Sequence, residues 1–113
     1  MNITKITLTA HQISGTAEGT GLVLSITPGY EFQNGKKTDI ISHMKYETVF
    51  TNNGYEKMTI KVLDTKPVLT NEAISQAGGQ KKVKFKNLSG RIYRTSTGEY
   101  AVSASAESAE VLA

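Results

Sequence analysis

The stretch YETVFTNNGYEKMTIKV, residues 46–62, contains two alternating segments joined by the dipeptide Asn53-Gly54. Alternation of apolar and polar residues is the pattern of a β-strand with one buried face. Asn and Gly both tolerate the positive φ angles that a tight hairpin turn requires. We therefore predict an antiparallel hairpin whose strands run from about 38 to 51 and from about 55 to 63.

The period of two assigns a buried and an outward face to each strand of this hairpin. The apolar positions assigned to the core are Ile40, Met44, Tyr46 and Phe50 in the first strand and Met58, Ile60 and Val62 in the second. The positions assigned to the outward face include His43, Lys45 and Glu47 in the first strand and Tyr55, Lys57, Thr59 and Lys61 in the second.

A short helix and a second hairpin are expected after Pro67. Residues 70–77 fit a helix of about two turns, with Thr70 or Asn71 as its N-cap and Gly78-Gly79 as its end. A long strand follows from Val83 to Tyr93. Its apolar positions change parity between Phe85 and Leu88, and Gly90 comes next, which indicates a bulge or sharp bend.

The C-terminal part contains one more predicted strand. Thr97-Gly98 supplies a hairpin-type turn, and the alternation of Tyr100, Val102 and Ala104 predicts the last strand. We expect the tail, residues 106–113, to be frayed or to form a terminal helical turn.

The N-terminal part is longer than one core strand needs. Residues 3–13 and 21–27 alternate, and we interpret them as a strand pair or as one bent strand with an insertion. We interpret the Gly-rich piece between them, residues 15–21, as a flexible loop. Pro28-Gly29 and Asn34-Gly35 are predicted turns around a short aromatic piece.

The length of 113 residues and the order of these elements predict one mainly β domain over residues 1–113. A short helix between the third and fourth core strands, together with a long bent strand, is typical of the OB-fold. We therefore expect a small OB-like antiparallel Greek-key barrel.

Composition excludes several classes of protein. The chain has no Cys, so it has no disulfide scaffold, thiolate metal site or Cys nucleophile. No apolar run approaches the roughly 20 residues needed to cross a bilayer, and no signal peptide is readable, so we expect a cytoplasmic protein without a membrane partner. The net charge of +3 permits a polyanionic partner without requiring one.

Motifs of catalysis are missing from the sequence. His11 and His43 are far apart and belong to no metal-binding spacing, and there is no G-x-S-x-G motif. The Gly-rich piece at 15–21 is not followed by Lys-Ser or Lys-Thr, as a phosphate loop would be. We therefore expect no catalytic residue, no metal, no cofactor and no enzymatic activity.

Basic residues are concentrated in one segment. Between residues 81 and 94 there are six Lys or Arg residues and no Asp or Glu, with Phe85 and Tyr93 among them. Cations for phosphates and ring faces for bases are what a single-stranded nucleic acid requires. A Lys-rich edge strand that blocks aggregation is the alternative interpretation of the same segment.

The residues predicted to bind nucleic acid are the basic and aromatic side chains assigned to outward faces. They are His43, Lys45, Tyr55, Lys57, Lys61, Lys82, Lys84, Lys86, Arg91 and Tyr93. In the expected barrel the third and fourth core strands both pair with the first. The cations of these two strands would then lie on either side of a groove.

Three stretches also carry a resemblance to a known family. YETVFTNNGYEKMTIKV (46–62), KVKFKNLSGRIYR (82–94) and YAVSASAESAEVL (100–112) resemble small OB-fold proteins related to single-stranded-DNA-binding proteins. That family is encoded by conjugative plasmids, integrative conjugative elements and prophages of Gram-positive bacteria. The resemblance implies an OB-like barrel and, for some members, single-stranded DNA binding during plasmid transfer or replication. The acidic, Phe-terminated tail of bacterial housekeeping single-strand binders is missing, because the chain ends Glu110-Val-Leu-Ala.

The sequence therefore predicts a non-enzymatic protein that binds single-stranded DNA with little sequence preference and serves a plasmid, conjugative element or phage. The alternative is a small β-barrel with a structural, assembly or adaptor role in a phage or secretion apparatus, which binds protein, for instance through an exposed strand edge. RNA as the ligand and homo-oligomerisation both stay open.

Overall fold

The computed structural model describes residues 7–16 and 19–112. The chain is mainly β, as predicted, and the described residues form eight strands and two short helices. In chain order these are β1 (Thr7–Leu8), α1 (Ala10–Ser14), β2 (Thr20–Gln33), β3 (Lys36–Phe50), β4 (Glu56–Val62), α2 (Asn71–Gln76), β5 (Lys81–Lys86), β6 (Ser89–Arg94), β7 (Tyr100–Ala106) and β8 (Ser108–Val111).

All eight strands belong to one sheet in the order β1-β6-β7-β4-β3-β2-β5-β8. Only the β4–β7 pair is parallel among these strands. β5 and β6 are separated by Asn87-Leu88, and β7 and β8 by Glu107. Asn87 has a φ of 54°, so the chain bends there, three residues before Gly90. The predicted bend is therefore confirmed.

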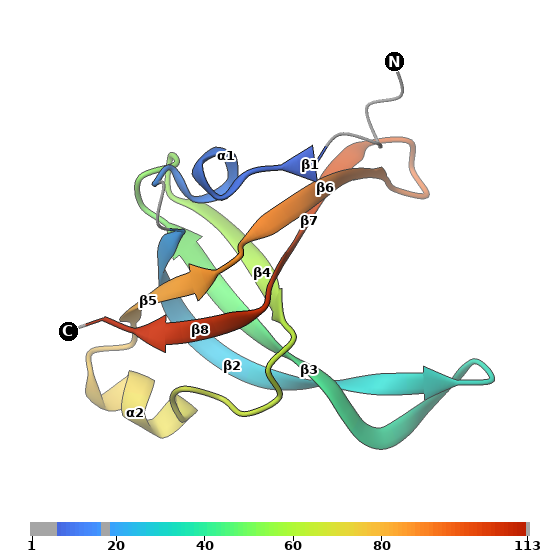
Figure 1. The fold of residues 1–113 in the computed structure, drawn as a ribbon, viewed down its shortest axis with the longest axis horizontal. Coiled ribbons are helices and arrows are strands. Elements are labelled where there is room, and N and C mark those ends of the chain that lie inside the picture. The colour runs from blue at the N-terminus through green and yellow to red at the C-terminus, as the bar shows by residue number, and fades with distance from the viewer. Residues whose placement is uncertain (1–6, 17–18, 113) are drawn as a thin grey trace.

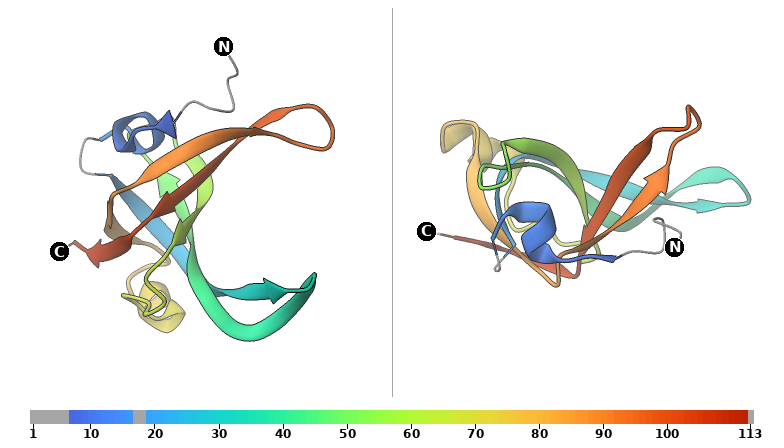
Figure 2. Two further views of the ribbon diagram at one scale, coloured as in Figure 1. Left: turned by 45° about the vertical axis from the view of Figure 1, so that its right-hand side comes forward. Right: turned by 90° about the horizontal axis from the view of Figure 1, so that it is seen from above.

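The core lies where the sheet curls over itself (Figure 2). The rings of Tyr46 and Phe50 on β3 meet the ring of Phe85 on β5 edge-on, with centroids 5.8 and 6.4 Å apart. Burial raises the pKa of Tyr46, whose hydroxyl accepts a hydrogen bond from the Val68 amide at 3.3 Å. The predicted core position Ile40 is wrong, because its side chain is exposed on a part of β3 that extends beyond the core.

The hairpin around Asn53-Gly54 is confirmed. β3 and β4 pair antiparallel from Met44↔Val62 to Phe50↔Glu56. The connection spans residues 51–55 and is longer than a two-residue turn. Gly54 and Tyr55 have φ values of 65° and 59°, so Tyr55 belongs to the turn and not to the strand as predicted.

The helix predicted at 70–77 is confirmed as α2. The Thr70 hydroxyl accepts the Ala73 amide at 3.1 Å, and Gly78 and Gly79 end the helix at positive φ. Asn71 ties the helix to β2, because its Oδ1 accepts the Ile26 amide at 2.7 Å and its Nδ2 donates to the Ile26 carbonyl at 2.9 Å. Two turns of helix are thus fixed by tertiary contacts.

The predicted strand at 3–13 is wrong over most of its described length. Residues 3–6 lie outside the described residues, β1 covers only Thr7–Leu8, and α1 follows. The Thr9 hydroxyl accepts the Gln12 amide, and the Gln12 side chain accepts the Thr9 amide, which is a capping box. This reciprocal cap begins a helix where the alternation of residue types predicts a strand.

The predictions of a turn at Pro28-Gly29 and of a frayed or helical tail are both wrong, because each segment belongs to a strand. Pro28-Gly29 is not a turn, because β2 continues through it to Gln33 and pairs with β3. The tail is neither frayed nor helical over its described part, because β8 pairs with β5 from Lys86↔Ser108 to Val83↔Val111. The turns at Asn34-Gly35 and Thr97-Gly98 are confirmed.

Two hairpins project from the core toward the same side of the molecule (Figure 1). We call residues 30–41 the β2–β3 arm and residues 92–102 the β6–β7 arm. β4 and the adjoining part of β7 lie between the bases of the two arms.

Candidate nucleic-acid interface

Basic side chains gather on the outward face of β3 and β4. Lys45 and Lys61 lie directly opposite each other in the antiparallel register, and both are exposed. His43 lies two residues before Lys45 and shares its face. The acidic residue Glu47 on this face is engaged by the Thr59 hydroxyl, which donates to Glu47 Oε1.

The same face continues across β7 to β6. Lys61 lies beside Ser105 in the parallel register, and Ser105 and Ser103 lie opposite Ser89 and Arg91. Hydroxyl groups next to cations are typical of surfaces that contact phosphates. We call this surface the polar face and define it by His43, Lys45, Thr59, Lys61, Arg91, Tyr93, Ser103 and Ser105.

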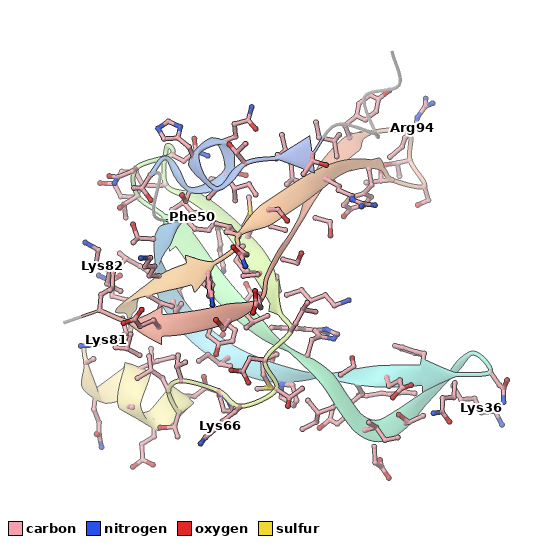
Figure 3. The ribbon with its side chains drawn as sticks, viewed as in Figure 1. Lys36, Phe50, Lys66, Lys81, Lys82 and Arg94 are labelled. Carbon is pink, nitrogen blue, oxygen red and sulfur yellow. The ribbon has the colours of Figure 1, made fainter. Side chains whose placement is uncertain are left out.

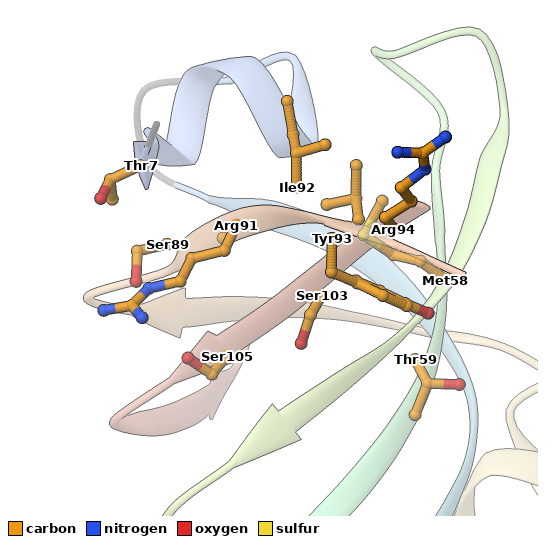
Figure 4. A pocket seen from close by; sticks show the side chains of 12 residues that line it. Thr7, Met58, Thr59, Ser89, Arg91, Ile92, Tyr93, Arg94, Ser103 and Ser105 are labelled. Atoms are coloured by element: carbon orange, nitrogen blue, oxygen red, sulfur yellow. The ribbon is translucent and has the colours of Figure 1, made fainter. Parts of the chain in front are cut away.

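The polar face contains a hollow of about 1050 Å³. Figure 4 shows Ser89, Arg91 and Ser105 on one side of it and Met58 and Thr59 on the other, with Tyr93 and Ser103 between them. Tyr93 is about half exposed, so its ring is available to a ligand. The lining of the hollow thus combines two guanidinium groups, five Ser or Thr hydroxyls and an exposed aromatic ring.

His43 is the most enclosed basic group of the polar face. Its ring covers Gly29 on β2, where an added Cβ would lie 2.1 Å from Nε2. Its Nδ1 is 2.8 Å from the Ser42 hydroxyl. Burial, followed by the charges of Lys61 and Lys45, holds the pKa of His43 below its ordinary value. The imidazole is therefore more often neutral than a free histidine would be.

The lysines of β5 lie on another part of the molecule. Lys82, Lys84 and Lys86 share one face of β5, as predicted. However, β5 pairs with β2 and β8, and Lys84 lies opposite Glu110. In Figure 3, Lys81 and Lys82 lie on the side away from Lys36 and Arg94, which mark the two arms.

The predicted arrangement of two cationic groups about a groove is therefore corrected. Counted as core strands, β2 is the first, β4 the third and β5 the fourth. The expectation that the third and fourth both pair with the first holds for β5, which pairs with β2. It fails for β4, which pairs with β3 and β7. Two strands, β3 and β2, consequently separate Lys61 on β4 from Lys84 on β5.

Lys57 and Tyr55 lie at the end of the molecule where β3 turns into β4. Lys57 is opposite Val49, and it lines a second hollow of about 500 Å³ together with Tyr100. Tyr55 stands on the turn itself and is 74% exposed. The structure thus brings together five of the ten predicted residues, which are His43, Lys45, Lys61, Arg91 and Tyr93.

Several aromatic and basic residues on the arms were missed in the sequence analysis. Phe32 and Tyr100 are exposed on the two arms. Lys37 Nζ lies 4.6 Å from the centre of the Tyr30 ring, and the Arg94 guanidinium lies 6.0 Å from that of Tyr100. The sequence contains a signal for the β2–β3 arm: the turn dipeptide Asn34-Gly35 has aromatic residues before it and lysines after it.

Tyr55 offers a test that separates binding from stability. A tyrosine at a φ of 59° is strained, and Asn tolerates this conformation better, so we expect Tyr55→Asn to raise the free energy of unfolding by up to about 1 kcal/mol. If the ring stacks on a base, the same variant should bind oligo-dT more weakly, by about 1–3 kcal/mol. Urea denaturation and fluorescence anisotropy measure the two effects, and Tyr55→Phe should bind like the parent. Unchanged binding by Tyr55→Asn would show that the bound strand does not reach Tyr55 on the turn.

Over residues 7–16 and 19–112, no helix is long and apolar enough to span a membrane. Within these same ranges, no three His, Asp or Glu side chains are grouped as ligands for a metal ion. Comparisons of the chain with protein-family models, with curated proteins and with solved structures give no match.

Proposed function

We propose that this protein binds single-stranded DNA without sequence preference, and that the polar face is its binding surface. The observation that carries this proposal is the continuous row of Lys45, Lys61 and Ser105 beside Arg91 and Tyr93. Cations and hydroxyls contact phosphates, and an exposed ring stacks on any base. Delivery or protection of a strand for a plasmid, conjugative element or phage is the role that we propose for this binding.

We further propose that the sheet is an OB-like barrel. In support, β2, β3 and β4 are consecutive antiparallel neighbours, and β4 pairs in parallel with β7. If β5–β6 and β7–β8 each count as one bent strand, the fourth core strand pairs with the first and the fifth. The helix α2 lies between the third and fourth core strands. OB-folds bind oligonucleotides on the face of their second and third strands, here β3 and β4.

The geometry favours a single strand over a duplex. The basic groups lie on strands of a curved sheet between two arms, and neither α1 nor α2 carries Lys or Arg to place in a major groove. Exposed rings on and beside the face can stack only on bases that are unpaired. A strand lying across β3, β4, β7 and β6 would meet Lys45 and Lys61 at one end and Arg91 and the ring of Tyr93 at the other.

A fluorescence-anisotropy titration with labelled oligo-dT at two salt concentrations tests the proposal. We expect binding at low salt that weakens as salt is added, because displaced counterions make phosphate contacts salt-dependent. An unlabelled mixed-sequence strand of equal length should compete as well as oligo-dT, and its duplex should compete poorly. Absence of binding at low salt would instead favour the protein-binding alternative.

The lowered pKa of His43 predicts a pH dependence of binding. A phosphate beside His43 would favour its protonated form, so binding takes up a proton and the affinity for oligo-dT should rise as pH falls from about 7.5 to about 5.5. The stability of the free protein depends on pH in the opposite direction. Because the pKa of His43 is lowered in the folded state, that state loses stability as pH falls through this range. Anisotropy titrations at several pH values measure the first effect.

The matched controls are two single substitutions. His43→Gln should flatten the pH dependence of the affinity, whereas His11→Gln should leave it unchanged, because His11 lies on α1 away from the polar face. Equal pH dependence in the parent and in His43→Gln would show that His43 does not contact the bound strand.

A further inference from the structure

The neighbouring strands β4 and β7 pair over only part of their length. Their parallel register joins Ile60↔Ala104, Lys61↔Ser105 and Val62↔Ala106, although β4 begins at Glu56 and β7 begins at Tyr100. The first segments of the two strands, residues 56–59 and 100–103, are therefore not paired with each other. Figure 1 shows β4 and β7 diverging toward these ends. We call the gap between the two segments the slot.

The two hollows of the surface follow one another along the slot. If the parallel register continued, Met58 would lie beside Val102, and these two residues line both hollows. Thr59 and Ser103, which are closer to the paired ends, line the larger hollow of about 1050 Å³. The residues nearer the starts of both strands line the smaller hollow of about 500 Å³. Open space thus extends along the whole slot.

Both sides of the slot are regular strand edges. β4 pairs with β3, and β7 pairs with β6, without a shift of register. The Leu63 amide donates to the Ala106 carbonyl at 3.0 Å, so these two groups point across the gap between the strands. Because this direction alternates along an extended strand, the amides and carbonyls of Lys57, Tyr100 and Val102 point into the slot. In the described part of the chain, no turn bonds to these groups.

The backbone groups of the slot fit a polypeptide better than a nucleic acid. An extended peptide presents an amide and a carbonyl at every residue, so it can bond to both edges as the missing strand. The phosphates of a nucleic acid offer only acceptors, which cannot pair with the carbonyls of Lys57, Tyr100 and Val102. The chemistry of the two edges therefore identifies a peptide as the ligand of the slot.

The side chains around the slot favour acidic and apolar residues in that peptide. The larger hollow is lined by Arg91 and Arg94 and, among the described residues, by no Asp or Glu. The smaller hollow has one acid, Glu56, and one base, Lys57. Val102 is 40% exposed and lies on the opposite face of the sheet from Arg91, which is registered with Ser103. A strand in which acidic and apolar residues alternate would complement both faces.

We propose that the slot binds an extended segment of a partner protein, with alternating acidic and apolar residues, as an added strand between β4 and β7. Its acidic side chains would lie beside Arg91, and its apolar side chains beside Met58 and Val102. This is a second binding activity, and it does not require that the protein bind DNA. Because DNA on the polar face would also use Arg91, the two ligands should compete.

Fluorescence anisotropy with a labelled peptide of about six residues, in which Glu and Val alternate, tests the proposal. We expect this peptide to bind the full chain at low salt. The matched control is the same peptide with N-methylated Val residues, which keeps every charge but loses the amide donors along one side. The control should bind about tenfold more weakly or worse, because each lost hydrogen bond reduces the affinity by about 2- to 12-fold.

Val102 offers a matched pair of variants. Val102→Pro removes an amide that points into the slot, whereas the bonds to β6 come from the alternate residues Ala101 and Ser103 and stay in place. Val102→Ala keeps the amide and shortens the side chain. We expect Val102→Pro to bind the Glu/Val peptide about 2- to 12-fold more weakly than Val102→Ala does. Circular dichroism checks that both variants fold, and the two peptides on the parent protein decide the question if Val102→Pro does not.

The outcomes separate a bound strand from simple attraction between charges. Failure of the Glu/Val peptide to bind at low salt would overturn the proposal. Equal binding of the methylated and unmethylated peptides would also overturn it, because charge alone would then hold them on the polar face. Weaker binding of the methylated peptide supports the slot whether or not the protein binds oligo-dT, so a failure of the proposed DNA binding leaves this test intact.

Discussion

Replacing Lys45, Lys61 and Arg91 together by Ala is expected to weaken the binding of oligo-dT more than any other change of three charges in this protein. Each cation on the polar face would contact one phosphate, and each phosphate contact contributes about 0.7 to the salt slope of a single strand. The plot of log affinity against log salt should therefore become shallower by about 2. All three side chains are exposed, so the free energy of unfolding should change little.

The β5 lysines provide the matched control for this experiment. Lys82→Ala, Lys84→Ala and Lys86→Ala together remove the same charge from a strand that faces Glu110 on β8. If the polar face is the binding surface, this triple variant should lose less affinity and keep most of the salt slope. A larger loss from the β5 variant would instead place the bound strand on β5. The alternative interpretation of this segment as a Lys-rich edge strand is wrong, because β5 pairs with both β2 and β8. Equal losses from both variants would mean that net charge, and not a particular face, governs binding.

The features that the sequence predicted correctly are those encoded by neighbouring residues. Asn53-Gly54 makes a hairpin because both residues accept positive φ, and the strands beside it alternate in hydrophobicity. The helix α2 is capped by Thr70 and followed by the left-handed Gly78, and both signals lie within a few positions of each other. The bend at Asn87 is visible in the sequence because the alternation of apolar residues changes parity between Phe85 and Leu88. None of these features needs knowledge of a distant segment.

Local signals also account for one mistake. Thr9 and Gln12 have the T-x-x-Q spacing of a capping box, which outweighs alternation over a segment as short as residues 9–14. The helix then becomes stable because its buried Ile13 packs against Gly90, where an added Cβ would lie 2.9 Å from Ile13 Cδ1. The spacing was readable from the sequence, but the partner at Gly90 was not.

Other mistakes arose from long-range pairing. Proline lacks an amide donor, which makes Pro28 a turn signal by itself. In the structure β2 pairs with β5 only from Thr20 to Val23, so Pro28 lies where one edge of β2 is free of β5 and its missing donor costs little. Likewise, the cations of 81–94 fall into separate groups because the chain bends at Asn87, sending β5 toward β8 and β6 toward β7.

Gly15→Ala is expected to cause the largest loss of stability among single substitutions at the described glycines with positive φ. Gly15 ends α1 at a φ of 81°, and a Cβ there would lie 2.1 Å from the Asn52 carbonyl oxygen. Gly15 therefore lies directly against the backbone of the β3–β4 turn. The same turn is tied to α1 by Asn53 Nδ2, which donates to the Ile13 carbonyl at 2.8 Å. An alanine must therefore push the helix and the turn apart and break this bond. We expect the free energy of unfolding to fall by about 2–4 kcal/mol, measured by urea denaturation.

Gly35→Ala separates the two causes of this loss. Gly35 has almost the same φ, 77°, but an added Cβ would meet no atom within 4 Å. Its substitution should lower the free energy of unfolding only by the strain of a left-handed alanine, about 1–2 kcal/mol. The difference between the two variants then measures the clash with the Asn52 carbonyl. If Gly15→Ala were no more destabilising than Gly35→Ala, α1 would not be docked on the turn, and the shape of the molecule beside β6 would differ from the one described.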